Sequence, residues 1–266
     1  AASAAAYEAI IRQVGPERLV GIRTLDVGGD KPLPYLPVAA EANPFLGVRA
    51  LRLAPRQPEL FVTQLRAAMR AAAVPGAGPV KVMAPMVADA LDVDLLLELS
   101  DRARRELHAA SIPHGEIELG VMLEIPSAIL VAGSYFGRLR FASIGTNDLL
   151  QYALAVDRGN RELGRYQDPL HPALLRLVRD AVGAAGRAGI ELSVCGEMAG
   201  DPVAALALVG LGIRDLSMAS SSLAPVRRAI RAVERTVLEA EVSAALDAAS
   251  AAEVRARFAA LAPGRD

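Results

Sequence analysis

Several side chains that can bind anions or metal ions stand directly after short apolar runs typical of strands. Arg23 opens the segment RTLDVGGDK at the end of one such run, and Glu124 follows the apolar run of GVMLEIPSA. A further arginine, Arg49, lies in NPFLGVRALR, after a Pro and Gly loop and near the start of the following helix. An arginine guanidinium binds carboxylate or phosphate oxygens through two parallel hydrogen bonds. A carboxylate at the end of a buried strand is costly unless it is paired. Glu124 therefore requires a metal ion or an arginine beside it.

Two later segments place further polar groups after apolar runs. FASIGTNDLLQYALAVDRGN predicts Asn147 and Asp148 at the end of one strand and Arg158 in the loop after a short helix, and LSVCGEMAGDP predicts Cys195 at the end of the next strand. Glu124 and Asp148, at the ends of neighbouring strands, would supply two hard oxygen ligands for one Mg²⁺. Cys195 could exchange protons if arginines and a metal ion lay nearby.

Each of these residues also has an ordinary structural explanation. Arg23 could be paired in a structural turn, and Arg49 could be a solvated residue near the start of a helix. Asp148 could cap the helix that follows it, and Cys195 could be an inert core thiol. Taken singly, each residue leaves both interpretations open, and the pairing of Glu124 with Asp148 is the stronger indication.

Composition and charge restrict the class of protein. A chain of 266 residues with 53 % hydrophobic residues can bury one large core. Lys and Arg number 29 against 30 Asp and Glu, so no overall field favours nucleic acid or an anionic membrane. The single cysteine excludes an intramolecular disulfide, and neither a membrane span nor a signal peptide is recognisable. We expect a soluble cytoplasmic protein with a small ligand.

Strand-like runs alternate with longer segments of helical period, which predicts parallel strands joined by crossover helices. The expected strands are Leu19–Arg23, Val80–Met83, Leu119–Leu123, Phe141–Ile144, Leu192–Val194 and Asp215–Ser217. The expected helices are Gln57–Ala73, Leu91–Ala110, Pro126–Ala132, Asp148–Val156, Pro172–Ala188, Pro202–Val209 and Ala224–Val237.

Polar residues at the strand ends favour a (β/α)8 TIM barrel over an open doubly wound sheet, although composition does not separate the two. About six of the eight strands are recognisable, so we expect an α/β barrel that is incomplete at its N-terminus. The barrel domain is predicted to span residues 1–237, and residues 238–266 form a helical tail. The chain opens in the helix-like SAAAYEAIIRQVG without an initiator Met, which suggests a piece of something longer.

The five quoted segments, in this order, resemble the phosphoenolpyruvate-binding domain of enzyme I of the bacterial sugar phosphotransferase system. The resemblance runs from about Tyr7 to Arg231, and GTNDLLQYALAVDR distinguishes enzyme I from more distant relatives. Pyruvate phosphate dikinase and phosphoenolpyruvate synthase share the barrel and are less similar. The resemblance therefore implies a phosphoenolpyruvate-protein phosphotransferase.

This resemblance implies a role for each candidate residue. Phosphoenolpyruvate would be held by Arg23, Arg49, Asn147, Asp148 and Arg158. Mg²⁺ would be bound by Glu124 and Asp148, and Cys195 would protonate the enolate carbon. The phosphoryl group would pass to a histidine on a separate N-terminal domain and then to the histidine phosphocarrier protein, releasing pyruvate. A homodimer is also implied.

The sequence departs from the family pattern in several places. It begins after the strand that ends in a GLYRTEF-like motif, whose arginine binds phosphate, and no stretch resembles the motif of the acceptor histidine. Val48 stands where the family often has Trp, and Ala84 where it often has Phe. We therefore expect the chain alone to bind phosphoenolpyruvate without completing turnover. The alternatives are a fragment of a dikinase or synthase, or a catalytically silent regulatory paralogue.

Overall fold

The computed structural model describes residues 2–28, 31 and 41–262. Part of the predicted turn after Arg23, including Gly29, therefore lies outside the described residues. The chain divides into two compact units. Unit 1 comprises Ala1–Met122 with Arg138–Phe141, and unit 2 comprises Leu123–Gly137 with Ala142–Asp266.

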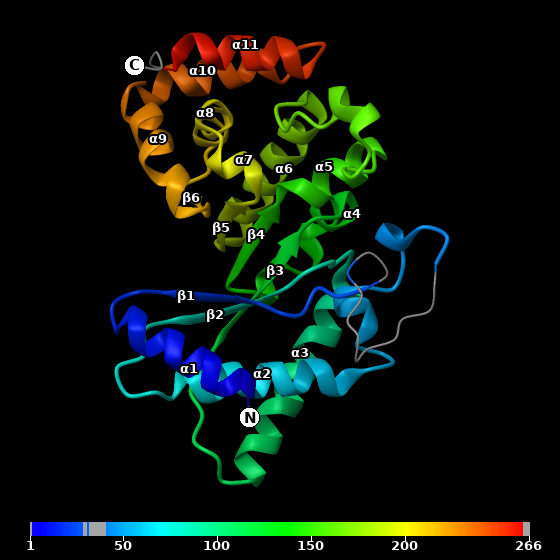
Figure 1. Cartoon of the computed structure of the whole chain (residues 1–266), viewed down its shortest axis with the longest axis vertical. Helices are drawn as coiled ribbons and strands as arrows, with labels where there is room; N and C mark the ends of the chain where they lie inside the picture. The colour runs from blue at the N-terminus through cyan, green and yellow to red at the C-terminus, as the bar shows by residue number, and fades with distance from the viewer. Residues whose placement is uncertain (1, 29–30, 32–40, 263–266) are drawn as a thin grey trace. The chain divides into compact units, whose positions relative to one another are not determined.

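Six strands follow one another through the sheet in chain order (Figure 1). They are β1 (Val20–Arg23), β2 (Val80–Ala84), β3 (Glu118–Leu123), β4 (Phe141–Gly145), β5 (Glu191–Cys195) and β6 (Asp215–Leu216). The pairs β1–β2, β2–β3 and β5–β6 are parallel. A doubly wound sheet reverses its strand order at a switch point, whereas a barrel wall keeps the chain order. The predicted α/β fold, an incomplete (β/α)8 barrel with six strands, is confirmed.

Three helices form the helical part of unit 1. They are α1 (Ala2–Val14), α2 (Pro58–Ala72) and α3 (Ala90–Ala109), with short 3-10 turns at Pro44–Leu46 and Ala50–Leu53. Helix α2 packs against both α1 and α3, and its buried face includes Phe61, Val62 and Leu65. Helix α3 begins where the Asp89 carboxylate accepts hydrogen bonds from the N–H groups of Leu91 and Asp92. Such a cap satisfies donors that the helix itself leaves without partners.

Unit 2 is mainly helical around β4, β5 and β6. Its helices are α4 (Pro126–Leu130), α5 (Thr146–Leu154), α6 (Pro172–Ala188), α7 (Glu197–Gly200), α8 (Pro202–Gly210), α9 (Ser220–Arg231), α10 (Arg235–Ala245) and α11 (Ala251–Leu261), with 3-10 turns at Ala132–Ser134, Phe136–Arg138 and Arg161–Tyr166. Helix α8 is almost entirely apolar and packs against α9, α10 and α11. An all-round apolar helix is stable only when its whole surface is covered.

One predicted helix is wrong in its extent. The segment Ala224–Val237 divides into α9 and α10, because Ala232–Glu234 leaves the helical path and Glu234 adopts an extended conformation (ψ 139°). Both α9 and α10 pack on α8, so the chain must turn between them. The Ala-rich sequence contains no strong helix-stop residue at this point.

The division at residues 237 and 238 into a barrel domain and a tail stays a prediction.

The remaining strands and helices lie close to their predicted limits, with differences of one or two residues at most ends. Among the described residues, no helix combines the length and the apolar character needed to cross a bilayer.

Candidate functional site

The seven predicted site residues are divided between the two units. Unit 1 holds two arginines, and unit 2 holds the metal-binding, amide, arginine and thiol candidates. The first group is Arg23 and Arg49, and the second is Glu124, Asn147, Asp148, Arg158 and Cys195.

Arg23 is the last residue of β1 and is exposed. Its backbone carbonyl accepts a hydrogen bond from the Gln64 side-chain amide at 3.3 Å, and the Gln64 carbonyl oxygen accepts one from the Leu25 N–H at 2.8 Å. A side chain of α2 therefore holds the backbone on both sides of the strand end. This places Arg23 at the carboxyl end of the strand, as the sequence predicted.

Arg49 is buried in unit 1, with no exposed surface. Its Nη2 donates to both carboxylate oxygens of Asp26 at 2.9 Å, and its Nε donates to Oδ1 at 3.1 Å. Lys31 Nζ donates to Asp26 Oδ2 at 2.8 Å. The alternative of a solvated helix residue is wrong, because Arg49 begins a short 3-10 turn in the interior.

Asp26 is a site residue that the sequence analysis missed, although it lies within RTLDVGGDK. Burial alone would raise the pKa of Asp26, but the hydrogen bonds and charges of Lys31 and Arg49 outweigh burial and lower that pKa. Gly28 permits the close approach, because a Cβ at that position would lie 2.1 Å from the Arg49 Cβ. Asp26 thus remains ionised and fixes the plane of the Arg49 guanidinium.

Glu124 and Asp148 are both buried in unit 2, with 2 % and 5 % of their surface exposed. Glu124 directly follows β3, and its side chain lies against Gly145 at the end of β4, where an added Cβ would be 2.7 Å from Oε1. Asp148 lies three residues further on, in the first turn of α5. Helix α5 begins at Thr146 with Gly145 as its N-cap residue, so Asp148 does not occupy the N-cap position.

The donor set of Glu124 and Asp148 suits a hard cation. Two carboxylates are too few for a closed structural site, and no group of three or more His, Cys, Asp or Glu side chains in the described ranges is arranged to hold a metal. Mg²⁺ is commonly bound by one or two carboxylates while water and substrate oxygens complete its shell. These residues therefore fit Mg²⁺ as a cation shared with a ligand.

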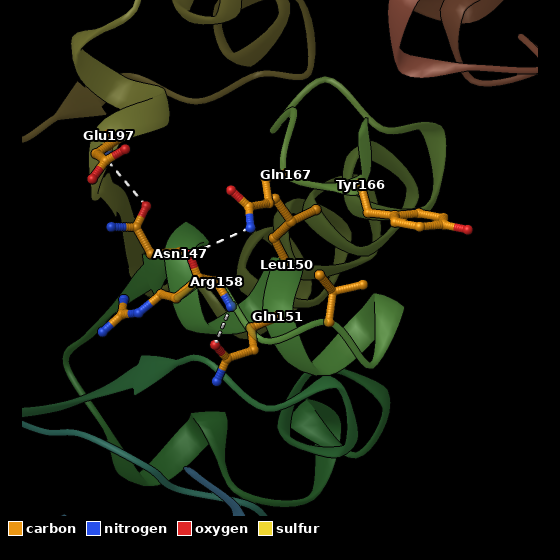
Figure 2. Close-up of a pocket in the computed structure, with 8 residues that line it drawn as sticks. Asn147, Leu150, Gln151, Arg158, Tyr166, Gln167 and Glu197 are labelled. Atoms are coloured by element: carbon orange, nitrogen blue, oxygen red, sulfur yellow. Dashed lines mark hydrogen bonds between the residues drawn. The ribbon is translucent and has the colours of Figure 1, made fainter. Parts of the chain in front are cut away.

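Arg158 and Asn147 line one pocket of about 220 Å³ in unit 2 (Figure 2). The Arg158 N–H donates to Gln151 Oε1 at 3.0 Å, and the Arg158 carbonyl accepts from Gln167 Nε2 at 3.3 Å. Gln167 also donates to the carbonyl of Asn160 at 3.0 Å. Side chains therefore hold this loop from both sides, while the guanidinium extends toward the Asn147 side of the pocket.

The Arg158 guanidinium forms an ion pair with Asp148, at 3.5 Å between Nη1 and Oδ1. This pair brings a predicted anion-binding group next to a predicted metal ligand within unit 2. A substrate oxyanion bound by Arg158 would therefore lie close to a cation bound by Asp148.

Cys195 ends β5, and its Sγ donates to the Ile144 carbonyl on β4 at 3.4 Å. It lines a second pocket of about 540 Å³. Asn147 and Glu197 line both pockets, so the Arg158 pocket and the Cys195 pocket share these two residues. Glu197 was missed by the sequence analysis, although it stands two residues after Cys195. Its N–H donates to Asn147 Oδ1 at 3.2 Å, as Figure 2 shows.

Unit 2 thus combines two buried carboxylates, an amide and a thiol, which lie at or just after the ends of successive strands, with an arginine in the loop after α5. An arginine and an amide bind an oxyanion, hard carboxylates bind Mg²⁺, and a thiol can give a proton to carbon. The arrangement is suited to a small anionic substrate that also coordinates a metal ion.

Comparison with known proteins identifies the family of the chain. The family described as PEP-utilising enzyme, PEP-binding domain, matches residues 2–235. The chain is 44 % identical over 234 residues to a multiphosphoryl transfer protein of Rhodobacter capsulatus, covering 88 % of this chain and 27 % of that protein. It is 41 % identical to a phosphoenolpyruvate-protein phosphotransferase of Borreliella burgdorferi, covering 88 % and 40 %.

A third relative, named phosphoenolpyruvate-dependent phosphotransferase system, comes from Escherichia coli and is 42 % identical over 96 % of this chain and 34 % of that protein. The chain spans less than half the length of each of these relatives. The family match nevertheless covers nearly all the strands and helices described above. The chain therefore belongs to the PEP-binding domain family of PEP-utilising enzymes.

Proposed function

We propose that this chain is the phosphoenolpyruvate-binding part of a phosphoenolpyruvate-protein phosphotransferase of the sugar phosphotransferase system. In this proposal the phosphoryl group passes to a histidine in another part of the longer protein and then to a histidine phosphocarrier protein, with release of pyruvate. The observation that carries the proposal is that Asn147 lines both the Arg158 pocket and the Cys195 pocket, while Asp148 pairs with Arg158.

The substrate carries two anionic groups, a phosphate and a carboxylate, and both need cationic partners. Arg158 and Asn147 of unit 2 would bind oxyanion oxygens of the substrate, and Arg23 and Arg49 are proposed as further oxyanion ligands. The assignment of Arg49 to the substrate rests on the family resemblance, because its guanidinium is bound by Asp26 and has no exposed surface.

Glu124 and Asp148 would hold Mg²⁺, and the bound ion would neutralise charge on the transferring phosphoryl group. When the phosphoryl group leaves, the bond between phosphorus and the enol oxygen breaks and an enolate remains. The Cys195 thiol would then donate its proton to the methylene carbon, giving pyruvate and a thiolate that later regains a proton. Proton delivery at that carbon makes the transfer favourable.

The proposal also includes the cellular compartment, the oligomeric state and the ligands of the protein. The protein would act in the cytoplasm as a homodimer, with phosphoenolpyruvate and pyruvate as ligands. The names of the relatives favour a phosphotransferase over the dikinase, the synthase and the silent paralogue considered from the sequence.

Isothermal titration of phosphoenolpyruvate in Mg²⁺ buffer tests this function. The wild-type chain and Cys195→Ala should bind alike, because the thiol acts after binding. Glu124→Ala should lose the Mg²⁺-dependent part of the binding, whereas Glu239→Ala, which removes an exposed carboxylate paired with Arg235 on α10, should not. If Glu124→Ala kept the Mg²⁺-dependent part of phosphoenolpyruvate binding, the proposed metal site would be excluded.

A further inference from the structure

The backbone around Cys195 is held by the two residues that begin α5. The Thr146 hydroxyl donates to the Cys195 carbonyl at 3.0 Å, and the Asn147 side-chain oxygen accepts from the Glu197 N–H at 3.2 Å. Thr146 is buried, with 1 % of its surface exposed. Consecutive side chains thus bind the polar groups on both sides of Gly196.

Gly196 itself adopts a conformation with φ 100° and ψ −176°, which L-residues almost never take. An added Cβ would lie 2.6 Å from the Thr146 hydroxyl and 3.1 Å from Asn147 Oδ1. The glycine therefore lets the chain turn sharply at the end of β5 and lets both side chains reach their partners. Without these two hydrogen bonds, the glycine would leave the turn free to change its conformation.

The Cys195 thiol depends on this turn for its position. It belongs to the last residue of β5, and its Sγ donates to Ile144 O on β4. Thr146 is the first residue of α5 and stands two residues after Ile144 of β4. The junction of β4 and α5 therefore contacts both the thiol and the carbonyl of Cys195. Threonine suits this task, because its β-branched side chain has few rotamers.

We propose that Thr146 is a positioning residue that holds the Cys195 thiol in its working orientation by binding the Cys195 carbonyl. The role of the thiol as proton donor rests on the proposed function, but the positioning does not. Proton transfer to carbon requires close alignment, and small misplacements of a reacting group reduce rates strongly. Thr146 would therefore affect proton delivery and leave the binding of the substrate oxyanions unchanged.

Alkylation of the thiol by iodoacetamide tests the positioning directly, because Cys195 is the only cysteine of the chain. Thr146→Val removes the hydrogen bond to the Cys195 carbonyl, so the thiol should leave its contact with Ile144 more often. Alkylation should accelerate by about three- to tenfold, which corresponds to the net free energy of one hydrogen bond. Thr146→Ser keeps the hydroxyl and should restore the wild-type rate. Ser193→Ala is the matched control, since Ser193 also bonds from β5 to β4, to the Ala142 carbonyl at 3.5 Å.

The second measurement is deuterium exchange at the methyl group of pyruvate with Mg²⁺ in D₂O. Thr146→Val should lower kcat by about tenfold or more with little change in KM. Thr146→Ser and Ser193→Ala should behave as wild type. If Thr146→Val accelerates alkylation as expected but the wild-type chain exchanges no protons, the proposed function fails and the positioning role stands.

Equal alkylation rates for Thr146→Val, Ser193→Ala and wild type, with all three folded by circular dichroism, would overturn the positioning role. A failure of Thr146→Ser to restore the wild-type rate would overturn it as well. Should Thr146→Val not fold, Gly196→Ala replaces it, because its methyl group would push the Thr146 hydroxyl from the Cys195 carbonyl. Gly196→Ala should then accelerate alkylation too, and an unchanged rate would contradict the proposal.

Discussion

Arg49 and Asp26 form a buried ion pair in which one guanidinium nitrogen contacts both carboxylate oxygens at 2.9 Å. The two residues are 23 positions apart in the chain, so the pair ties the turn after β1 to the 3-10 segment that Arg49 begins. Removing one member of a buried pair leaves the other charge without compensation, which is far costlier than losing an exposed pair. The pair therefore stabilises the strand end that presents Arg23.

Asp26→Asn should lower the free energy of unfolding by about 3 kcal/mol, as for other broken buried pairs. Lys31→Met removes the second, partly exposed partner of the same carboxylate and should cost about 1 kcal/mol or less. Urea unfolding followed by circular dichroism measures both. Equal losses of unfolding free energy in the two variants would show that Arg49 is not the main partner of Asp26.

The strands and most helices could be predicted from the sequence, because β-branched runs bordered by Gly, Pro or Asn leave a local signal. The partners of the site residues could not. Asp26 and Arg49 are far apart in the chain and are brought together by the tertiary fold, so no local sequence pattern indicates that they pair. Likewise, the role of Glu197, the first residue of α7, depends on its bond to Asn147, and the role of Gln167 depends on the carbonyl of Arg158. The break between α9 and α10 depends on the packing of both helices on α8, and such packing cannot be recognised in the sequence.

The C-terminal helix should make stability depend on pH. Arg255 of α11 donates to both oxygens of Asp168, at 2.7 and 2.8 Å, and to Asp201 at 2.8 Å. Burial raises the pKa of Asp168, but the hydrogen bond from Arg255, the Leu170 N–H and nearby positive charge outweigh it and lower that pKa below 3.8. The folded pKa is thus below the unfolded one, so the contribution to stability is complete above about pH 4 and is lost as the pH falls through the folded pKa.

Asp168→Asn should therefore be less stable than wild type at neutral pH, and the difference should shrink as the pH falls below about 4. Urea unfolding of both proteins between pH 7 and pH 3 measures this convergence. A difference that stays constant over the whole range would mean that the Asp168 charge does not contribute.

Gln167 should control the affinity of the Arg158 pocket. Its amide donates to the carbonyls of Arg158 and Asn160, and its side chain lines the pocket. Gln167→Ala should weaken phosphoenolpyruvate binding by about three- to tenfold, because the loop that carries Arg158 loses anchoring hydrogen bonds. Isothermal titration measures the change. Gln57→Ala is the control, since Gln57 precedes α2 in unit 1 and makes no capping bond; a comparable loss there would argue against a local effect.

Gly145 should be required for the metal-dependent part of binding. Its Cα faces the Glu124 side chain so closely that a methyl group would lie 2.5 Å from Glu124 Cγ and 2.7 Å from Oε1. Gly145→Ala should therefore displace the Glu124 carboxylate and weaken phosphoenolpyruvate binding in Mg²⁺ by about tenfold or more, since metal coordination tolerates little displacement of a ligand. Titration of phosphoenolpyruvate with and without Mg²⁺ separates this loss from a general one.

Gly133→Ala is the matched control for Gly145→Ala, because nothing lies within 4 Å of a methyl group at that position in the same unit. It should bind as wild type under both conditions. If Gly145→Ala kept its full Mg²⁺-dependent affinity while remaining folded, the Glu124 carboxylate could not be a ligand of the ion. The two buried carboxylates would then owe their positions to packing and ion pairing, and the arginines alone would have to hold the substrate phosphate.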